Sequence, residues 1–226
     1  MSVVRPYGPR AVFDPACTRC PRLAAFLAEV RCEQPGYHAA PVASFGDNDP
    51  SLLIVGLAPG MHGANRTGRP FTGDYAGVLL YDTLHRFGFG SQAEALSVDD
   101  GLKLKRARIT NAVKCLPPQN KPLPAEIRNC NDYLRAELAL LRRGALVLAL
   151  GTVAHQAVLR AMDLRLADHA FKHGARHDLP GGRQLFNSYH CSRYNTQTRR
   201  LTPQMFQAVF AEIIAVLDGK DGKGSA

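Results

Sequence analysis

The sequence predicts an α/β protein, a three-layer α/β/α sandwich around a mainly four-stranded parallel sheet. Short apolar runs that are typical of buried strands recur along the chain, and segments with helical periodicity separate them. Strands that alternate with helices form right-handed crossovers, so the sheet is expected to be parallel and covered on both faces. The length of 226 residues fits one domain, which we expect to span 1–218, followed by a disordered tail over 219–226.

The first half of the chain is expected to contain two helices and two strands. Residues 20–34 carry apolar side chains at helical spacing, which predicts a helix there. The apolar run 51–55 ends at Gly56, as is typical of a buried strand. A helix over 76–87 and a second strand over 108–113 follow.

The second half repeats the alternation. A helix over about 124–143 has Pro124 near its start and Glu126 in its first turn, as helix N-termini prefer. The run 145–150 is apolar throughout and predicts the third strand, which Gly151 and another helix follow. A strand over 184–190 and a helix over about 202–217 complete the domain.

The formal net charge is +9, and many arginines contribute to it. A basic surface of this size favours a polyanionic partner, with nucleic acid ahead of acidic membrane lipid. No signal-peptide pattern is present, and no apolar stretch reaches the roughly 20 residues that span a bilayer. Free cysteines without an export signal indicate a reducing compartment, so we expect a cytoplasmic protein without a membrane partner.

Four of the six cysteines predict a metal or cluster site. Cys17 and Cys20 form a C-x-x-C pair, and Cys115 and Cys130 follow far downstream. Four thiolates that converge from distant segments suit a soft metal or an iron–sulfur cluster, and would close a long loop. C-x-x-C alone also suits zinc or a dithiol redox motif, although the second pair does not repeat it as a zinc ribbon would. The other two, Cys32 and Cys191, are expected to be small buried hydrophobes.

The carboxyl ends of three expected strands carry unusual residues. These ends are the segments 56–60, 111–115 and 189–192. Ligands bind at this edge of a parallel sheet, so the fold is expected to gather the three segments into one cleft.

The glycine-rich segment 56–74 begins at the first of these strand ends. It matches neither a Walker A sequence nor a G-x-G-x-x-G fingerprint. Its arginines, Arg66 and Arg69, suit phosphates. Phe71 is either a platform for a flat ring or a core aromatic under the loop, and Asp74 is either a helix cap or a carboxylate aimed into the cleft.

Histidines and arginines elsewhere receive simpler interpretations. His155 is expected to be structural. His169, His173 and His177 have metal-like spacing but no acidic or thiol partner nearby, so we do not expect a second metal site. The arginines that flank the last strand end are expected to meet phosphates; they are Arg193, Arg199 and Arg200.

Together, four motifs resemble those of the iron–sulfur uracil-DNA glycosylases, most closely family 5, the B type. They are the 56–60 loop, Gly-Arg-Pro-Phe-Thr-Gly-Asp ending at Asp74, Asn-Ala-Val-Lys-Cys-Leu-Pro-Pro from Asn111, and Asn-Ser-Tyr-His-Cys-Ser-Arg-Tyr-Asn-Thr-Gln-Thr from Asn187. With the cysteines they span 17 to about 202 in the expected order. Leu57 stands where family 4 has a glutamate, which favours family 5, and Cys191 replaces the usual proline.

The resemblance implies roles for individual residues. Phe71 would stack on a flipped base, Asn111 would read its Watson–Crick edge, and His190 would reach its O2. Asp74 matches the acidic residue of the extended first motif, and His190 and Asp74 are therefore the implied catalytic pair. The loop after His190 resembles a segment that enters the minor groove. Further implied substrate-binding residues are Gly56, Ser192, Arg193 and Asn195, and the implied ligands of a 4Fe–4S cluster are Cys17, Cys20, Cys115 and Cys130.

The implied function is DNA repair. The enzyme would flip out uracil, and other deaminated bases such as hypoxanthine, from double- or single-stranded DNA and hydrolyse the N-glycosidic bond. A histidine donor would stabilise charge on the leaving base, and Asp74 would stabilise the sugar cation or orient water unless leaving-group stabilisation suffices. We expect a nucleoid-associated monomer. The alternatives are a non-catalytic iron–sulfur nucleic-acid-binding protein and an electron-transfer protein.

Overall fold

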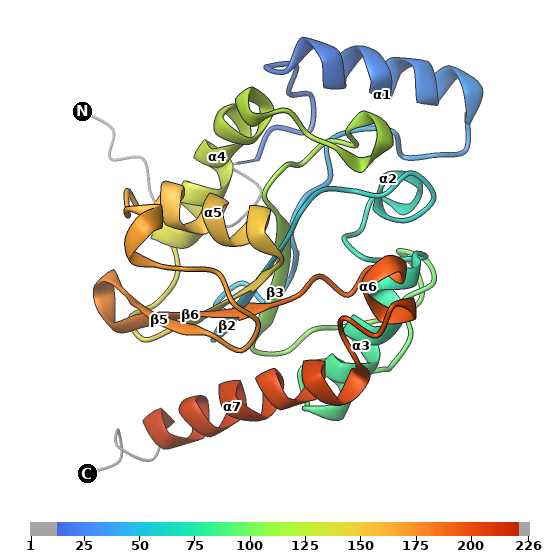
Figure 1. Cartoon of the computed structure of the whole chain (residues 1–226). Helices are drawn as coiled ribbons and strands as arrows, with labels where there is room; N and C mark the ends of the chain where they lie inside the picture. Colours follow the sequence, from blue (N-terminus) through green and yellow to red (C-terminus); the bar gives the residue numbers. More distant parts are fainter. Residues whose placement is uncertain (1–12, 222–226) are drawn as a thin grey trace, which may run out of the picture.

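The computed structural model describes residues 13–221 and contains one six-stranded sheet (Figure 1). The strand order is β1-β3-β2-β4-β6-β5. The strands are β1 (Phe45–Gly46), β2 (Leu52–Gly56), β3 (Ala107–Asn111), β4 (Leu146–Leu150), β5 (Arg176–Leu179) and β6 (Arg183–Ser188). The four central strands β3, β2, β4 and β6 are parallel, which confirms the predicted core of the sheet.

Two antiparallel strands at the edges of the sheet were not predicted. β1 pairs with β3, and β5 pairs with β6. β1 has only two residues, and β5 reads Arg-His-Asp-Leu and is buried only at Leu179. Neither has the apolar run by which a buried strand is recognised, because an edge strand needs to cover less of the core.

Helices cover both faces of the sheet, as the three-layer prediction requires (Figure 1). Side chains alternate along the strands: Leu53 and Val55 join one buried cluster, and Leu52 and Ile54 join the other. Helices α1, α4 and α5 pack on the first cluster, and α3 and α7 pack on the second. The helices are α1 (Pro21–Glu33), α2 (Ala64–Thr67), α3 (Tyr75–Arg86), α4 (Pro124–Ala139), α5 (Thr152–Ala161), α6 (Arg193–Gln197) and α7 (Pro203–Asp221), with 3-10 turns at η1 (Pro118–Asn120), η2 (Leu166–Asp168) and η3 (Pro180–Gly182).

Some boundaries differ from the expected ones. α4 ends at Ala139, and the chain then turns through Gly144, at a φ of 75°, before β4 begins. β6 ends at Ser188 rather than at 190, since the Tyr189 backbone N–H donates to the ring of His173 instead of to a strand. α7 continues to Asp221, beyond the expected end, and residues 222–226 of the predicted tail lie outside the described residues. Within 13–221, no helix combines the length and apolar character needed to cross a membrane.

The topology brings four strand ends to one edge of the sheet. Because β2, β3, β4 and β6 are parallel, the segments that follow Gly56, Asn111, Leu150 and Ser188 leave the sheet on the same side. The three segments singled out by sequence therefore meet, and the end of β4 joins them.

Candidate active site

A cavity of about 480 Å³ lies at this edge of the sheet. Its walls come from the loop after β2, the start of α3, and the ends of β3, β4 and β6. Six predicted residues line it: Phe71, Asp74, Asn111, His190, Ser192 and Arg193. The predicted cleft is thus present, and it holds both implied catalytic residues.

Phe71 forms one wall and faces His190. The two rings are nearly parallel, with centroids 5.8 Å apart and an interplanar angle of 27°. Phe71 is 5% exposed and belongs to the buried cluster on the α3 side, so it is both a core aromatic and a cavity wall. Its φ of 55° is unusual for a bulky residue and costs on the order of 1–3 kcal/mol, so the surrounding structure must hold it there.

Gly77 in α3 permits that backbone conformation. A Cβ at position 77 would lie 1.9 Å from the carbonyl oxygen of Phe71. Any side chain at 77 would therefore displace the Phe71 loop from the helix. The glycine fixes how closely the aromatic wall approaches α3.

Asn111 sits at the end of β3 with its side chain buried. Its Oδ1 atom has no hydrogen-bond partner among the described residues. Gly56, on the neighbouring strand, leaves room for it: a Cβ there would lie 2.4 Å from Asn111 Oδ1 and 2.7 Å from the Phe71 ring. Gly56 is not part of the cavity lining, and its contribution is the close approach of Asn111 and Phe71.

His190 follows β6 and lines the cavity. Its Nδ1 atom is buried without a partner within residues 13–221. Burial lowers the pKa of His190 to about 4, so the ring is neutral near pH 7 and carries one N–H donor. Asn195 does not line the cavity; its side-chain N–H donates to the His190 carbonyl over 2.8 Å and holds the loop. Cys191, in place of the usual proline, is fully buried in the core beneath.

Asp74 has both of the roles considered for it. As the N-cap of α3, its Oδ1 accepts the Gly77 backbone N–H over 2.8 Å. The same carboxyl group lines the cavity. Gly63 makes room for it, because a Cβ there would lie 2.5 Å from Asp74 Oδ2. Burial raises the pKa of Asp74, against the opposing hydrogen bonds from the backbones of Gly77 and Ala76.

Comparison with known proteins assigns the chain to a family. The family described as "Uracil DNA glycosylase superfamily" matches residues 43–214. The chain is similar to the type-5 uracil-DNA glycosylase of Thermus thermophilus, with 49% identity over 87% of this chain and 92% of the relative. It is also similar to type-5 uracil-DNA glycosylases of Pyrobaculum aerophilum (39% identity, 95% and 98% covered) and Mycobacterium bovis (42%, 87% and 76%). The chain is a type-5 member of the uracil-DNA glycosylase superfamily.

This type-5 family member uses its arginines in two different ways. Arg69 was expected to suit phosphates, and that prediction is wrong. It is 4% exposed and its two terminal nitrogens bind the carboxylate of Asp100 at 2.9 and 2.5 Å. Arg193 lines the cavity, with its guanidinium 5.6 Å from the centre of the Tyr75 ring. Arg200 lies over the ring of Tyr189 at 4.7 Å.

Several cavity residues were missed by sequence reasoning. Gly151 and Thr152 bring the N-terminus of α5 to the cavity, and within residues 13–221 no side-chain cap is seen at this helix end. Asn120, in a left-handed turn with a φ of 56°, closes another side. The signal for the first pair was available, since the third predicted strand ends at Gly151 and must reach the same edge. Tyr75 is a further unpredicted lining residue, whereas Leu57 and Ala58 belong to the 56–60 segment that was expected at this cleft.

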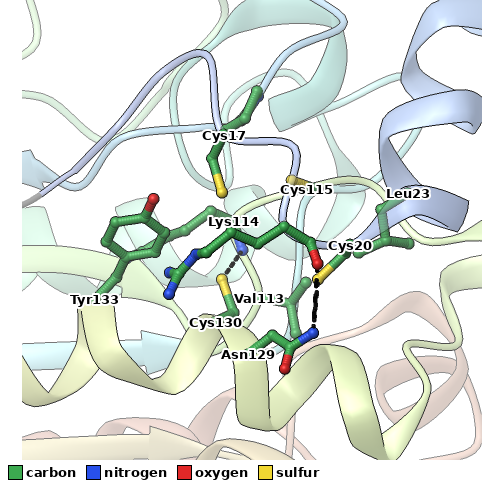
Figure 2. A pocket seen from close by; sticks show the side chains of 11 residues that line it. Cys17, Cys20, Leu23, Val113, Lys114, Cys115, Asn129, Cys130 and Tyr133 are labelled. Carbon is green, nitrogen blue, oxygen red and sulfur yellow. Dashed lines mark hydrogen bonds between the residues drawn. The ribbon is translucent and has the colours of Figure 1, made fainter.

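Four of the six cysteines, Cys17, Cys20, Cys115 and Cys130, line a separate pocket beside α1 and α4 (Figure 2). They come from the segment before α1, the segment after β3 and the middle of α4. Figure 2 shows their sulfur atoms directed into the same space. Cys130 Sγ accepts the Lys114 backbone N–H at 3.2 Å, and Cys20 Sγ accepts the Asn129 side-chain N–H at 3.8 Å.

The pKa values of the cysteines in this pocket suit four thiolates that bind one positively charged group together. Burial and the neighbouring cysteines raise the pKa of Cys115 to about 12. Burial also acts on Cys17, but hydrogen bonds from Tyr133 and Arg19 prevail and lower its pKa. Four thiols so arranged disfavour each other's ionisation, and a bound cationic centre removes that penalty. The residues present therefore fit a thiolate-bound metal or cluster.

The remaining cysteine and histidine predictions have mixed outcomes. Cys191 is buried as expected, but Cys32 is exposed, so that prediction is wrong. α1 buries Leu23, Leu27 and Val30 along one face, and position 32 falls on another. His155 is structural as predicted: its Nδ1 pairs with Asn187 Oδ1 at 2.9 Å and its Nε2 with the His169 carbonyl at 2.8 Å.

Proposed function

We propose that the protein hydrolyses the N-glycosidic bond of uracil in DNA and leaves an abasic site. One observation carries the proposal. An aromatic wall, a buried amide and a neutral histidine surround one cavity, and the amide and the histidine each keep a buried polar atom that no described residue satisfies. Buried polar atoms are nearly always paired, so these await a ligand with polar edges. The relatives named type-5 uracil-DNA glycosylases support uracil as that ligand.

The cavity suits a flipped base. A base in duplex DNA cannot reach it, so the nucleotide must first leave the stack, which costs a few kcal/mol. Stacking on the Phe71 ring and hydrogen bonds to Asn111 offset part of that cost. The glycine at 56 keeps these two side chains close enough to contact the same base.

His190 stabilises the departing base. As the glycosidic bond breaks, negative charge grows on the base and positive charge grows on the sugar. A neutral imidazole that donates an N–H to the base oxygen stabilises this charge in a site from which water is excluded. Because burial keeps the ring neutral near pH 7, His190 acts as a hydrogen-bond donor and transfers no proton.

Asp74 acts on the other product of bond cleavage. Its carboxylate faces the cavity while one oxygen also caps α3, which fixes its orientation. A fixed carboxylate stabilises an oxocarbenium-like sugar and can orient the attacking water. Leu57 offers no second carboxylate at the start of this loop, and Asp74 is the only carboxyl group among the described residues that line the cavity.

Contacts to the DNA backbone come from the rim of the cavity. Arg193 and the uncapped N-terminus of α5 both open onto it and suit phosphates. The net charge of +9 supports binding to double- and single-stranded DNA alike. We propose that a monomer suffices, since all the groups named here come from one chain.

A 4Fe–4S cluster held by Cys17, Cys20, Cys115 and Cys130 is part of the proposal. Their four sulfurs come from three segments of the chain and line one pocket. Four thiolates brought together from distant segments suit an iron–sulfur cluster. When bound, the cluster ties the segment before α1 to the segment that carries Asn111.

Hypoxanthine is a second proposed substrate base. Uracil and hypoxanthine both present an N–H beside a carbonyl on the edge that pairs in DNA. A single side-chain amide such as that of Asn111 can satisfy that pattern in either base.

The test is excision from a duplex that contains one uracil. Excess protein and end-labelled DNA are incubated, and alkali then converts abasic sites to strand breaks. We expect breaks at uracil and none in a matched thymine duplex, with hypoxanthine tested in parallel. Binding without abasic sites would instead support the non-catalytic nucleic-acid-binding alternative.

A further inference from the structure

A buried ion pair lies beside the aromatic wall of the cavity. Arg69, two residues before Phe71, donates from both terminal nitrogens to the two oxygens of Asp100, at 2.9 and 2.5 Å. The side chains are only 5% and 12% exposed, and the guanidinium lies 4.9 Å from the centre of the Phe45 ring. Burying two charges costs desolvation free energy even when the charges are paired. This ion pair must therefore do more than hold a surface loop.

Asp100 organises its own loop around the carboxylate. Oδ2 accepts the backbone N–H groups of Leu96 at 2.9 Å and Ser97 at 3.3 Å, and Oδ1 accepts that of Leu102 at 3.0 Å. The Arg69 guanidinium, with these backbone donors, holds the pKa of Asp100 far below its usual range. The carboxylate is therefore a fixed anchor on the segment between α3 and β3.

The same arginine reaches past Phe71 to the residue on its other side. Arg69 Nε donates to Thr72 Oγ1 at 2.7 Å. The Tyr81 hydroxyl donates to the Pro70 carbonyl at 2.7 Å, and the Gly73 backbone N–H donates to Ala95 O at 2.9 Å. Phe71 is thus bracketed on both sides by contacts that lead to α3 or to the Asp100 loop.

Phe71 needs such support because its backbone is strained. With a φ of 55°, the residue relaxes to another conformation unless its neighbours prevent it. Relaxation would move the ring away from its stacked position 5.8 Å from His190.

We propose that Asp100 is a positioning residue that holds Phe71, through Arg69 and Thr72, in the orientation that stacks on the flipped base. Asp100 does not line the cavity and contacts no reacting atom. That Phe71 stacks on a base rests on the proposed function, but the placement of Phe71 by Asp100 can be tested without it.

The test substitution is Asp100→Asn. An amide turns one acceptor oxygen into a donor that faces either Leu102 or the Leu96 and Ser97 N–H groups, and it removes the charge that pairs with Arg69. We expect single-turnover uracil excision to fall about 10²-fold, the size of effect that a displacement of about 1 Å produces. Because Asp100→Asn leaves a buried arginine unpaired, Arg69→Lys is the second variant: it keeps a cation but loses the fork and the Thr72 contact.

Two control variants separate positioning from loss of stability. Asp163→Asn breaks an equally bidentate pair with Arg135, at 2.6 and 2.9 Å, that lies exposed and away from the cavity. Ile213→Val trims the buried core cluster that Phe71 belongs to. Both should excise uracil at the wild-type rate below their melting temperatures.

The deciding measurement is a double-mutant cycle with Phe71→Ala. If Asp100 acts through Phe71, adding Asp100→Asn to Phe71→Ala should slow excision by less than about 3-fold, since the wall is already lost. If Asp100→Asn slows excision by a further factor of about 10² in the Phe71→Ala background, the two residues act independently and the proposal is wrong. A wild-type rate for both Asp100→Asn and Arg69→Lys would also overturn it.

Amide hydrogen exchange gives a readout that does not depend on activity. In Asp100→Asn, exchange should accelerate at Gly73 and in the 96–102 loop while α5 and β4 stay protected. If the wild-type protein releases no uracil, the proposed function fails but this measurement still decides the placement. Unchanged exchange in the Phe71 loop would refute the positioning role even if excision works.

Discussion

The base cavity and the cysteine pocket share one segment of chain but have opposite chemistry. Residues 111–115 supply Asn111 to the cavity at one end and Cys115 to the pocket at the other. In the cavity, Asn111 Oδ1 and His190 Nδ1 are buried without partners in the described chain. In the pocket, Lys114 and Asn129 already donate to two of the sulfurs.

The difference shows which site is built to exchange its contents. Unsatisfied polar atoms in a preformed cavity favour a ligand that enters, reacts and leaves. Sulfur atoms that receive hydrogen bonds and lie on three segments favour a resident group that ties those segments together. We therefore expect substitutions in the pocket to act on stability and substitutions in the cavity to act on rate.

The largest expected effect is that of Cys115→Ser. If the proposed cluster is bound, loss of one ligand should release iron and sulfide, bleach the brown colour that the cluster gives, and lower Tm by about 10 °C or more, because ligand binding supplies several kcal/mol of folding free energy. Iron and sulfide analysis with a thermal melt measures both. Cys32→Ser, on the exposed face of α1, is the matched control and should keep the colour. Stoichiometric zinc in colourless wild-type protein would contradict the cluster.

The second largest effect is expected for His190→Ala, and it should change the rate of excision rather than DNA binding. Removing a preorganised donor should slow single-turnover excision by about 10²- to 10³-fold while Kd for DNA changes little. His85→Ala, an exposed histidine in α3, is the control. Excision of uracil by His190→Ala at the wild-type rate would show that the leaving base needs no help from this ring.

The pH profile sharpens the same prediction. An ordinary histidine changes charge near pH 6.5, but burial lowers the pKa of His190 to about 4. Because the folded protein keeps the ring neutral down to that pH, the wild-type rate should show no inflection from His190 near 6.5. Between pH 6.5 and about 4 the unfolded chain binds the proton first, so this group makes stability fall as the pH falls.

The smallest effect is expected at the rim. Arg193→Ala should weaken binding to undamaged duplex several-fold and reduce the slope of log K against log salt by about 1. Fluorescence anisotropy over a salt series measures it, with Arg128→Ala on α4 as the control. An unchanged slope would place Arg193 outside the DNA contact.

Most of the fold could be predicted, because the four central strands are short apolar runs bounded by turns. The edge strands could not, since β1 is two residues long and β5 is polar. Phe71, Asp74, Asn111 and His190 could be placed together because parallel strand ends share one edge of the sheet.

Contacts between distant segments were beyond reach of the sequence. Arg69 stands in a polar glycine-rich loop and looks like a phosphate ligand until Asp100, 31 residues away, is seen to bind it. Cys32 is a small hydrophobic residue in the same helix as the buried Leu23, Leu27 and Val30, but it lies on the exposed side of that helix. Gly56 was expected to bind substrate, whereas its contribution is the space that it leaves for Asn111 and Phe71.

The order of strands in the sheet has a consequence for how the protein is made. The central pairing matches Leu52 of β2 with Leu146 of β4, and β6 then adds to β4. Pairings this distant in sequence form slowly, because the loop entropy must be overcome before the contacts are gained. Phe71 is therefore synthesised well before His190, and the cavity that both residues line is complete only after β6 has docked.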